Sequence, residues 1–154
     1  MAGAVSATFD VYRYDPKKDA EPRYQRYVLD GLPPHTPVLT ALLKIRGEVD
    51  PTLTLRYSCR SAICGSCAMQ VNSKSRLACE TPVGPEVERH GRIVVEPMRN
   101  QPVLRDLVVD QSPFWRQYQR IEPHLILDPR RPMPEGKETA MTPEQVARFK
   151  ETPR

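Results

Sequence analysis

The 154-residue sequence predicts an α+β fold, in which a mixed β-sheet curls over one helix and a helical, proline-rich extension follows. Two observations lead to this prediction. Apolar residues recur with the periods of a strand, a second strand, a helix and further strands up to about residue 100. Many of the 17 prolines fall in the second half, where they disfavour a regular sheet. This element order is that of a β-grasp fold, so we expect one β-grasp domain at 1–100 and an extension at 101–154.

The first three elements are predicted to be a hairpin and a helix. Residues 7–12 alternate between apolar and polar side chains, and residues 24–29 predict a second strand that pairs antiparallel with the first. Thr36 is expected to cap a helix that begins at Pro37 and ends at Gly47. The apolar side chains of this helix recur at helical spacing: Leu39, Leu42 and Leu43.

Shorter strands are predicted to follow this helix. Residues 53–57 alternate again and lead into a loop that contains three cysteines. Residues 68–71 and 76–78 are expected to form a hairpin around a turn at 72–74. Residues 92–96 predict the last strand, which Pro97 stops.

The extension is predicted to contain three short helices. Residues 103–108 have the pattern of an amphipathic helix, and a second helix is expected to open at Ser112. Residues 122–141 are proline-rich and predicted to be extended. Residues 142–145 match a capping box and open a last helix. The second helix is expected to dock on another surface, or on the domain itself, through Phe114, Trp115 and Tyr118.

Composition disfavours several classes of protein. The formal net charge is +4, but no basic run is long, so we do not expect nucleic-acid binding. The longest apolar runs are only a few residues, against roughly 20 needed to span a bilayer. Residues 1–10 have neither a basic nor an apolar stretch, and we therefore expect no export signal.

The four cysteines carry the strongest functional signal. They lie within 21 residues with the spacing C-x4-C-x2-C-x11-C, and the first three match the plant-type ferredoxin spacing. In that arrangement four thiolates hold a two-iron cluster. In a chain without an export signal, clustered cysteines indicate metal binding rather than disulfides. The sequence therefore predicts one [2Fe–2S] cluster, held by Cys59, Cys64, Cys67 and Cys79.

Other metal sites fit the sequence less well. A structural zinc site would more naturally pair two C-x2-C motifs, and only one is present, although a zinc module remains an alternative. A Rieske centre requires two histidines close to the cysteines. The three histidines are too distant in sequence and are expected on the surface: His35, His90 and His124. With no phosphate-binding loop and no activated nucleophile, the chain is predicted to carry electrons and to have no catalytic residue of its own.

Residues between the cysteines suit an iron–sulfur site. Gly65 and Ser66 are small and let backbone N–H groups approach the thiolates, and such hydrogen bonds raise a cluster's reduction potential. Arg60 is expected either to act in the same way or to face solvent or another subunit. Arg60 and Gly65 are therefore candidate cofactor-binding residues beside the cysteines.

Around these residues the sequence resembles the N-terminal half of the iron–sulfur subunit of succinate dehydrogenase and of the closely similar fumarate reductase. The resemblance implies a 2Fe-2S ferredoxin-like domain and the same four cysteine ligands. It rests on residues 57–60, 63–69 and 77–79, and it continues through 106–110, 121–123 and 142–145.

The resemblance also implies the partners. In that family the domain takes electrons from the FAD of a flavoprotein subunit. It passes them to [4Fe–4S] and [3Fe–4S] clusters in a second domain, and from there to quinone in a membrane anchor. No cysteine-rich second domain is in this sequence, so we expect a split subunit or a truncated one. The expected location is peripheral, on the cytoplasmic face of a bacterial inner membrane or the matrix face of a mitochondrial one.

Two departures and two alternatives accompany the resemblance. Ala62 stands where the family usually has glycine, so this part of the loop is expected to avoid positive φ. Ser73-Lys74 replaces a turn that commonly contains glycine. The sequence does not separate succinate oxidation from fumarate reduction. The alternative function is a free-standing [2Fe–2S] ferredoxin, which the basic charge and the extension disfavour.

Overall fold

The computed structural model describes residues 3–123 and 142–151. The chain divides into two units, 1–117 and 118–154. The predicted domain boundary at residue 100 stays a prediction. The first unit contains the sheet and the cysteine loop, and it is the part that positions the site.

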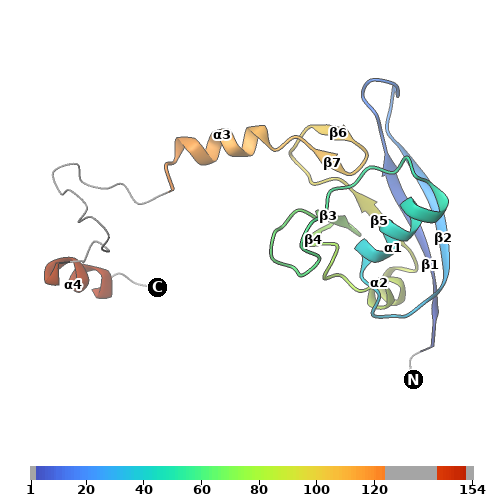
Figure 1. Cartoon of the computed structure of the whole chain (residues 1–154), viewed down its shortest axis with the longest axis horizontal. Coiled ribbons are helices and arrows are strands. Elements are labelled where there is room, and N and C mark those ends of the chain that lie inside the picture. Colours follow the sequence, from blue (N-terminus) through green and yellow to red (C-terminus); the bar gives the residue numbers. More distant parts are fainter. Residues whose placement is uncertain (1–2, 124–141, 152–154) are drawn as a thin grey trace. The chain divides into compact units, whose positions relative to one another are not determined.

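A five-stranded mixed sheet forms the first unit, as predicted for a β-grasp (Figure 1). The two strands of the predicted N-terminal hairpin pair antiparallel, with Thr8 opposite Val28, and the first of them pairs in parallel with the last long strand. This parallel central pair identifies the β-grasp arrangement. The spatial order is β2 (Arg23–Leu32), β1 (Val5–Arg13), β5 (Ile93–Glu96), β3 (Ala68–Val71) and β4 (Lys74–Leu77).

The helix after the hairpin, α1 (Val38–Lys44), starts differently from the prediction. Pro37, not Thr36, is the N-cap residue, and no side chain caps the helix. The backbone N–H groups of Val38 and Leu39 instead donate to the carbonyls of Thr81 and Ala78 at 2.8 and 2.9 Å. A distant segment therefore replaces the cap that the sequence pattern suggested.

Gly47 does not end this helix either. A π-helical turn, η1 (Ile45–Val49), continues from α1 and passes through Gly47. The turn closes when the Asp50 N–H donates to the Ile45 carbonyl at 2.8 Å.

The core lies between the sheet and the helices (Figure 1). Its fully buried side chains come from β1, α1, β3 and β5 and include Phe9, Leu42, Met69 and Ile93. A second helix that the sequence analysis missed, α2 (Val83–His90), adds Val83 to this core. The available signals were the i, i+4 spacing of Val83 and Val87 and the Gly91 C-cap, which has φ +70°.

Two other element predictions were wrong. Residues 53–57 form no strand, although Leu53 and Leu55 are buried. The Thr54 N–H donates to the Asp106 carboxylate, and the Thr54 carbonyl accepts from the Leu107 N–H. Residues 103–108 form no helix. They form a small antiparallel pair, β6 (Val103–Arg105) and β7 (Val108–Val109), and between these strands Leu107 enters the core.

The hairpin between β3 and β4 turns through two residues. Asn72 and Ser73 have φ of +47° and +64°, the left-handed conformation that a two-residue hairpin turn requires. Lys74 already belongs to β4, so this strand begins and ends earlier than predicted. The Asn72 side chain secures the turn by accepting from the Val94 N–H at 2.8 Å and donating to Glu86 at 2.9 Å.

A buried ionic network ties the 101–110 segment to the sheet. The Arg13 guanidinium donates to Asp106 at 3.1 Å and also to Asp50, and the Asp106 carboxylate accepts from the Tyr14 and Thr54 N–H groups at 3.1 and 2.9 Å. Burial alone would lower the pKa of Arg13, but its hydrogen bonds to the two carboxylates raise it above its usual value. The network fixes the stretch that leads into the cysteine loop.

Two predicted helices of the extension are confirmed. Helix α3 (Ser112–Arg120) carries the predicted aromatic residues, and the rings of Phe114 and Trp115 meet edge-to-face at 5.1 Å. Helix α4 (Pro143–Glu151) opens with the predicted capping box: the Thr142 N–H donates to Gln145 at 2.8 Å, and the Gln145 N–H donates to Thr142 at 3.3 Å. The docking role of α3 stays a prediction, and the predicted extended stretch 122–141 lies almost wholly outside the described residues.

Among the described glycines, Gly84 has the closest neighbouring atoms. A Cβ there would lie 2.7 Å from Pro34 Cβ and 2.9 Å from Pro34 O, closer than real Cβ contacts. We expect Gly84→Ala to destabilise the fold by about 1–3 kcal/mol, because overpacking outweighs alanine's higher helix propensity. Urea unfolding measures this. Gly47→Ala is the matched control, since nothing lies within 4 Å of that position. Equal unfolding midpoints for the two variants would contradict the expectation.

Candidate iron–sulfur site

The cysteine loop connects the 53–57 stretch to β3, and the fourth cysteine follows β4. Cys59 and Cys64 are exposed, Cys67 is buried and Cys79 is half-buried. None of the four forms a disulfide. The two segments meet where the Ala78 N–H donates to the Cys67 carbonyl at 3.2 Å. The β3–β4 hairpin thus brings the third and fourth cysteines together from positions that are distant in sequence.

Backbone N–H groups point at the sulfur atoms. Cys59 Sγ accepts from the Ser61 and Cys64 N–H groups, both at 3.4 Å. Cys64 Sγ accepts from the Cys59 N–H at 3.5 Å, and Cys79 Sγ accepts from the Ala62 N–H at 3.3 Å. Such donors stabilise thiolates and disperse negative charge.

Left-handed backbone positions create this geometry. Gly65 has φ +73°, as suits glycine, but Arg60 and Ala62 also have positive φ, +58° and +57°. The expectation that the loop avoids positive φ at Ala62 was therefore wrong. The left-handed conformation accompanies the hydrogen bond from the Ala62 N–H to Cys79, which links the loop to the hairpin. Non-glycine residues adopt it at a cost of order 1–3 kcal/mol, a cost that recurs at binding sites.

The four thiols form two pairs. Cys59 and Cys64 exchange N–H to sulfur contacts, and Cys79 is close enough to Cys67 to influence its pKa. A two-iron cluster takes two thiolates on each iron, which this pairing supplies. Among the described residues, no three thiol, imidazole or carboxyl groups converge as the ligands of one metal ion do.

The two pairs differ in their protonation chemistry. The Ser66 hydroxyl and nearby backbone N–H groups lower the pKa of Cys64 to about 6. Burial raises the pKa of Cys67. Metal ligation requires the thiolate, so Cys64 favours the ligating form near neutral pH, whereas Cys67 loses its proton less readily.

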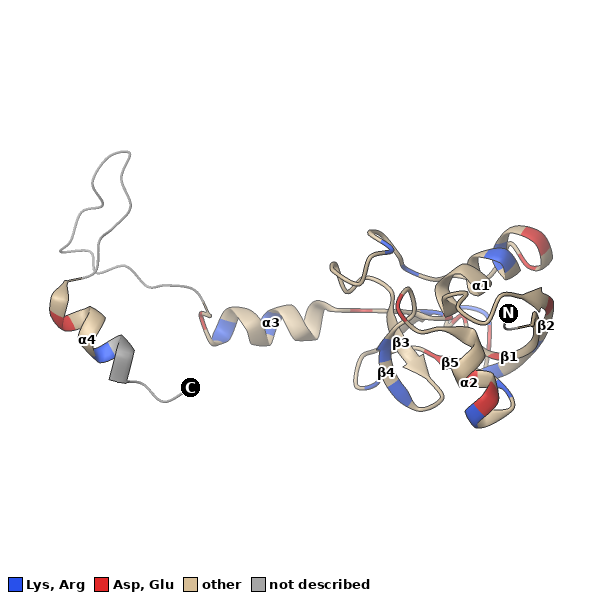
Figure 2. Ribbon diagram, turned by 90° about the horizontal axis from the view of Figure 1, so that it is seen from below, with Lys and Arg blue, Asp and Glu red and all other residues tan. Residues whose placement is uncertain are grey.

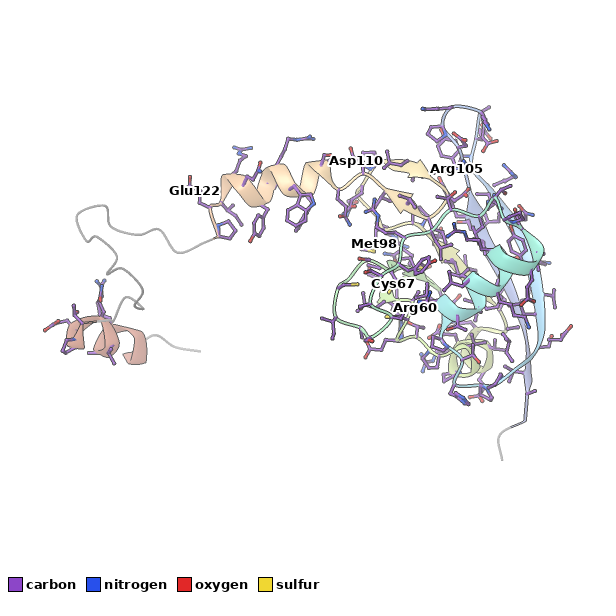
Figure 3. All side chains as sticks on the ribbon, in the orientation of Figure 1. Arg60, Cys67, Met98, Arg105, Asp110 and Glu122 are labelled. Carbon is purple, nitrogen blue, oxygen red and sulfur yellow. The ribbon has the colours of Figure 1, made fainter. Side chains whose placement is uncertain are left out.

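Arg60 is exposed beside the loop (Figure 3). Its guanidinium carbon lies 5.2 Å from the centroid of the Tyr57 ring, a cation–π distance. Its predicted part in holding the cofactor stays a prediction. Of the three histidines, His35 and His90 are exposed, as expected, and His124 lies outside the described residues.

A β-grasp sheet that presents four free thiols in two pairs, with backbone N–H groups directed at sulfur, defines a ferredoxin-type iron–sulfur domain. The chain belongs to the family of 2Fe-2S iron–sulfur cluster binding domains, which it matches over residues 8–116. Its cofactor is one [2Fe–2S] cluster, and the donor set described above fits that cluster.

Comparison with known proteins gives closely similar relatives. The fumarate reductase iron–sulfur subunit of Haemophilus influenzae is 39% identical over 153 residues, which are 99% of this chain and 58% of that protein. The succinate dehydrogenase iron–sulfur subunit of Paracoccus denitrificans is 41% identical over 120 residues, which are 78% of this chain and 45% of that protein. The chain thus spans about half the length of these relatives.

Solved structures agree on the fold. A chain of the Mycobacterium smegmatis Sdh1 complex in the apo form matches with a TM-score of 0.74 and 28% identity, over 96% of this chain and 58% of its own. A hypothetical protein from Helicobacter pylori matches with a TM-score of 0.55 and 20% identity, over 79% of this chain and 22% of its own, and shows the fold alone. Among the described residues, no helix has the length and apolar character to cross a bilayer.

Proposed function

We propose that the chain is the electron-relay component of a succinate dehydrogenase or fumarate reductase iron–sulfur subunit. The observation that carries the proposal is the paired arrangement of four thiols with their N–H donors. Similarity to iron–sulfur subunits of both enzymes over 99% and 78% of the chain supports it.

In this proposal each thiol pair would hold one iron. Cys59 and Cys64, which are exposed, would hold one, and Cys67 and Cys79 would hold the other. The bound cluster supplies reversible one-electron chemistry. The protein's own contribution is to hold the four thiolates, and the N–H groups of Ser61, Ala62 and Cys64 tune the potential. Gly65 gives the loop its turn, and Arg60 adds a positive charge beside it.

The proposed partners are those that the family resemblance implies. Electrons enter from the FAD of a flavoprotein subunit and leave to [4Fe–4S] and [3Fe–4S] clusters, which a separate chain or a further part of this one carries. Quinone in a membrane anchor is the final acceptor. The chain then lies peripherally on the cytoplasmic face of a bacterial inner membrane or on the mitochondrial matrix face.

The intact mass of the chain in the complex purified from its native membrane tests the partnership. A mass of 17.6 kDa plus cluster, with a separate cysteine-rich chain alongside, would establish a split subunit. A heavier chain would place the further clusters on the same polypeptide. Purification without any flavoprotein would contradict the proposal and favour a free-standing ferredoxin.

The reduction potential gives a second test. Plant-type centres lie near roughly −400 mV, too low for reduction by succinate, and each ~59 mV of mismatch costs tenfold in a one-electron equilibrium. Because four backbone N–H contacts reach the sulfur atoms, we expect a potential well above that value in the assembled complex. Potentiometric titration followed by EPR measures it. A value near the plant-type potential would argue against succinate oxidation and leave fumarate reduction or a free ferredoxin.

A further inference from the structure

A groove lies between α1 and the cysteine loop. Its volume is about 630 Å³, and Leu39, Leu43 and Tyr57 give it an apolar lining. Arg46 and Arg60 bring two guanidinium groups to it, and Cys79 lies in its wall. No acidic residue is among the described residues that line it. The groove is therefore apolar and positively charged, and it borders one of the proposed cluster ligands.

The fold sets both guanidinium groups in place. The π-helical turn Ile45–Val49 continues α1 and carries Arg46, and single π-turns of this kind are frequent at functional sites. The Arg60 guanidinium carbon lies over the Tyr57 ring, 5.2 Å from its centroid. Among the described residues neither arginine forms an ion pair, whereas Arg13, Arg26 and Arg92 each bind a carboxylate.

Charged residues elsewhere on the domain are mixed. Figure 2 shows Lys and Arg interspersed with Asp and Glu over the described part of the first unit. On the outer face of the sheet, Asp10 lies between Arg26 and Arg92, at 2.7 and 3.4 Å, and Glu96 lies in the same region, so two carboxylates accompany the two arginines there. The groove differs because its two positive charges have no carboxylate among the residues around them.

We propose that this groove seats an acidic peptide segment of the flavoprotein subunit. A carboxylate of that segment pairs with Arg46 and Arg60, and an aliphatic or aromatic side chain packs on the half-buried Leu43 and Tyr57. The inference rests on the proposed function, since it names the contact through which the electron donor docks. Bidentate guanidinium–carboxylate pairs fix orientation as well as charge, so two arginines above an apolar lining specify one pose.

The flavoprotein is the occupant for two reasons. Cys79 lines the groove, so a chain that binds there lies beside a proposed cluster ligand, as an electron donor does. In the curated relatives this region is part of one longer iron–sulfur subunit, of which it covers 58% and 45%. The remainder of the subunit is thus on the same polypeptide in those relatives, and the flavoprotein is the separate chain that exchanges electrons with this domain.

Charge reversal at Arg46 tests the inference. The full chain, loaded with its cluster, is titrated with the flavoprotein subunit at low and at high salt. We expect Arg46→Glu to raise the dissociation constant about tenfold or more at low salt and to flatten its salt dependence. Lys74→Glu is the matched control, with the same change of charge at the far end of the β3–β4 hairpin, and we expect less than about a twofold change.

A photo-crosslink identifies the occupant in the assembled complex. Benzoylphenylalanine at Thr40, an exposed groove residue, is expected to label a flavoprotein peptide that contains Asp or Glu. Labelling of another chain or of a second copy would overturn the inference.

The outcomes separate the two proposals. If the flavoprotein binds and reduces the wild-type cluster, but Arg46→Glu behaves like wild type, only the groove assignment fails. If the flavoprotein neither binds nor reduces the wild-type chain, the proposed function fails, and the inference fails with it.

Discussion

Asp106→Ala is expected to lower the free energy of unfolding by about 3–5 kcal/mol, the usual cost of breaking a buried ion pair from one side. The Asp106 side chain is 4% exposed and accepts from the Arg13 guanidinium and from two backbone N–H groups. Removing the carboxylate leaves these buried donors without their hydrogen-bond acceptor. The chain between Thr54 and Asp106 includes the loop that carries Cys59. We therefore also expect the variant to retain its cluster less well.

Thermal and urea unfolding followed by circular dichroism measure this effect. A loss of this size is a large part of the 5–15 kcal/mol that typically stabilises a domain, and it corresponds to a midpoint lowered by roughly 10–20 °C. Asp30→Ala is the control, because that carboxylate is exposed and, within residues 3–123 and 142–151, accepts a hydrogen bond from the Ser6 hydroxyl alone. An Asp106→Ala variant as stable as the control would mean that the network is not important for stability.

Cys79→Ala is expected to remove most of the bound iron and the visible absorption of the cluster while the β-sheet remains folded. In the proposed ligand set the substitution removes one of the four thiolates, and the sequence has no fifth cysteine to replace it. The backbone bond from the Leu39 N–H to the Ala78 carbonyl does not depend on the Cys79 side chain, so secondary structure should persist.

Iron and sulfide content per chain, the visible spectrum and circular dichroism check this prediction together. Ser61→Ala is the matched loop variant, since the Ser61 hydroxyl donates to the Cys59 carbonyl at 3.1 Å and to no other group in the described part of the chain. It should keep about two irons per chain. A Cys79→Ala protein with the same iron content and spectrum would refute the ligand assignment.

Features encoded by local sequence were predictable. The alternation in 7–12 and 24–29 gave the first hairpin, because one face of each strand packs on the core. The capping box at Thr142 was visible since its two hydrogen bonds join residues three apart. The cysteine spacing pointed to the cofactor, because ligand number and type set the chemistry of the site.

Features decided by distant contacts were not predictable. Thr36 looked like a helix cap, but Thr81 and Ala78 accept the N–H bonds that a cap would satisfy. The 103–108 pattern fits a helix as well as a strand pair, and burial of Asp106 against Arg13 decided between them. Positive φ at Ala62 was not predicted, because it accompanies a hydrogen bond to Cys79, 17 residues away in sequence.

The capping of α1 by residues 78–81 has a consequence for folding order. The helix gains hydrogen-bond partners for its first turn only after a segment about 40 residues downstream has been made, and β1 gains its parallel neighbour only when β5 exists. Short helices are marginal in isolation, so α1 cannot act as an early local nucleus. During synthesis the sheet and the first turn of α1 are therefore completed only when the chain has been made through β5, and the Cys67–Cys79 pair is built in the same interval.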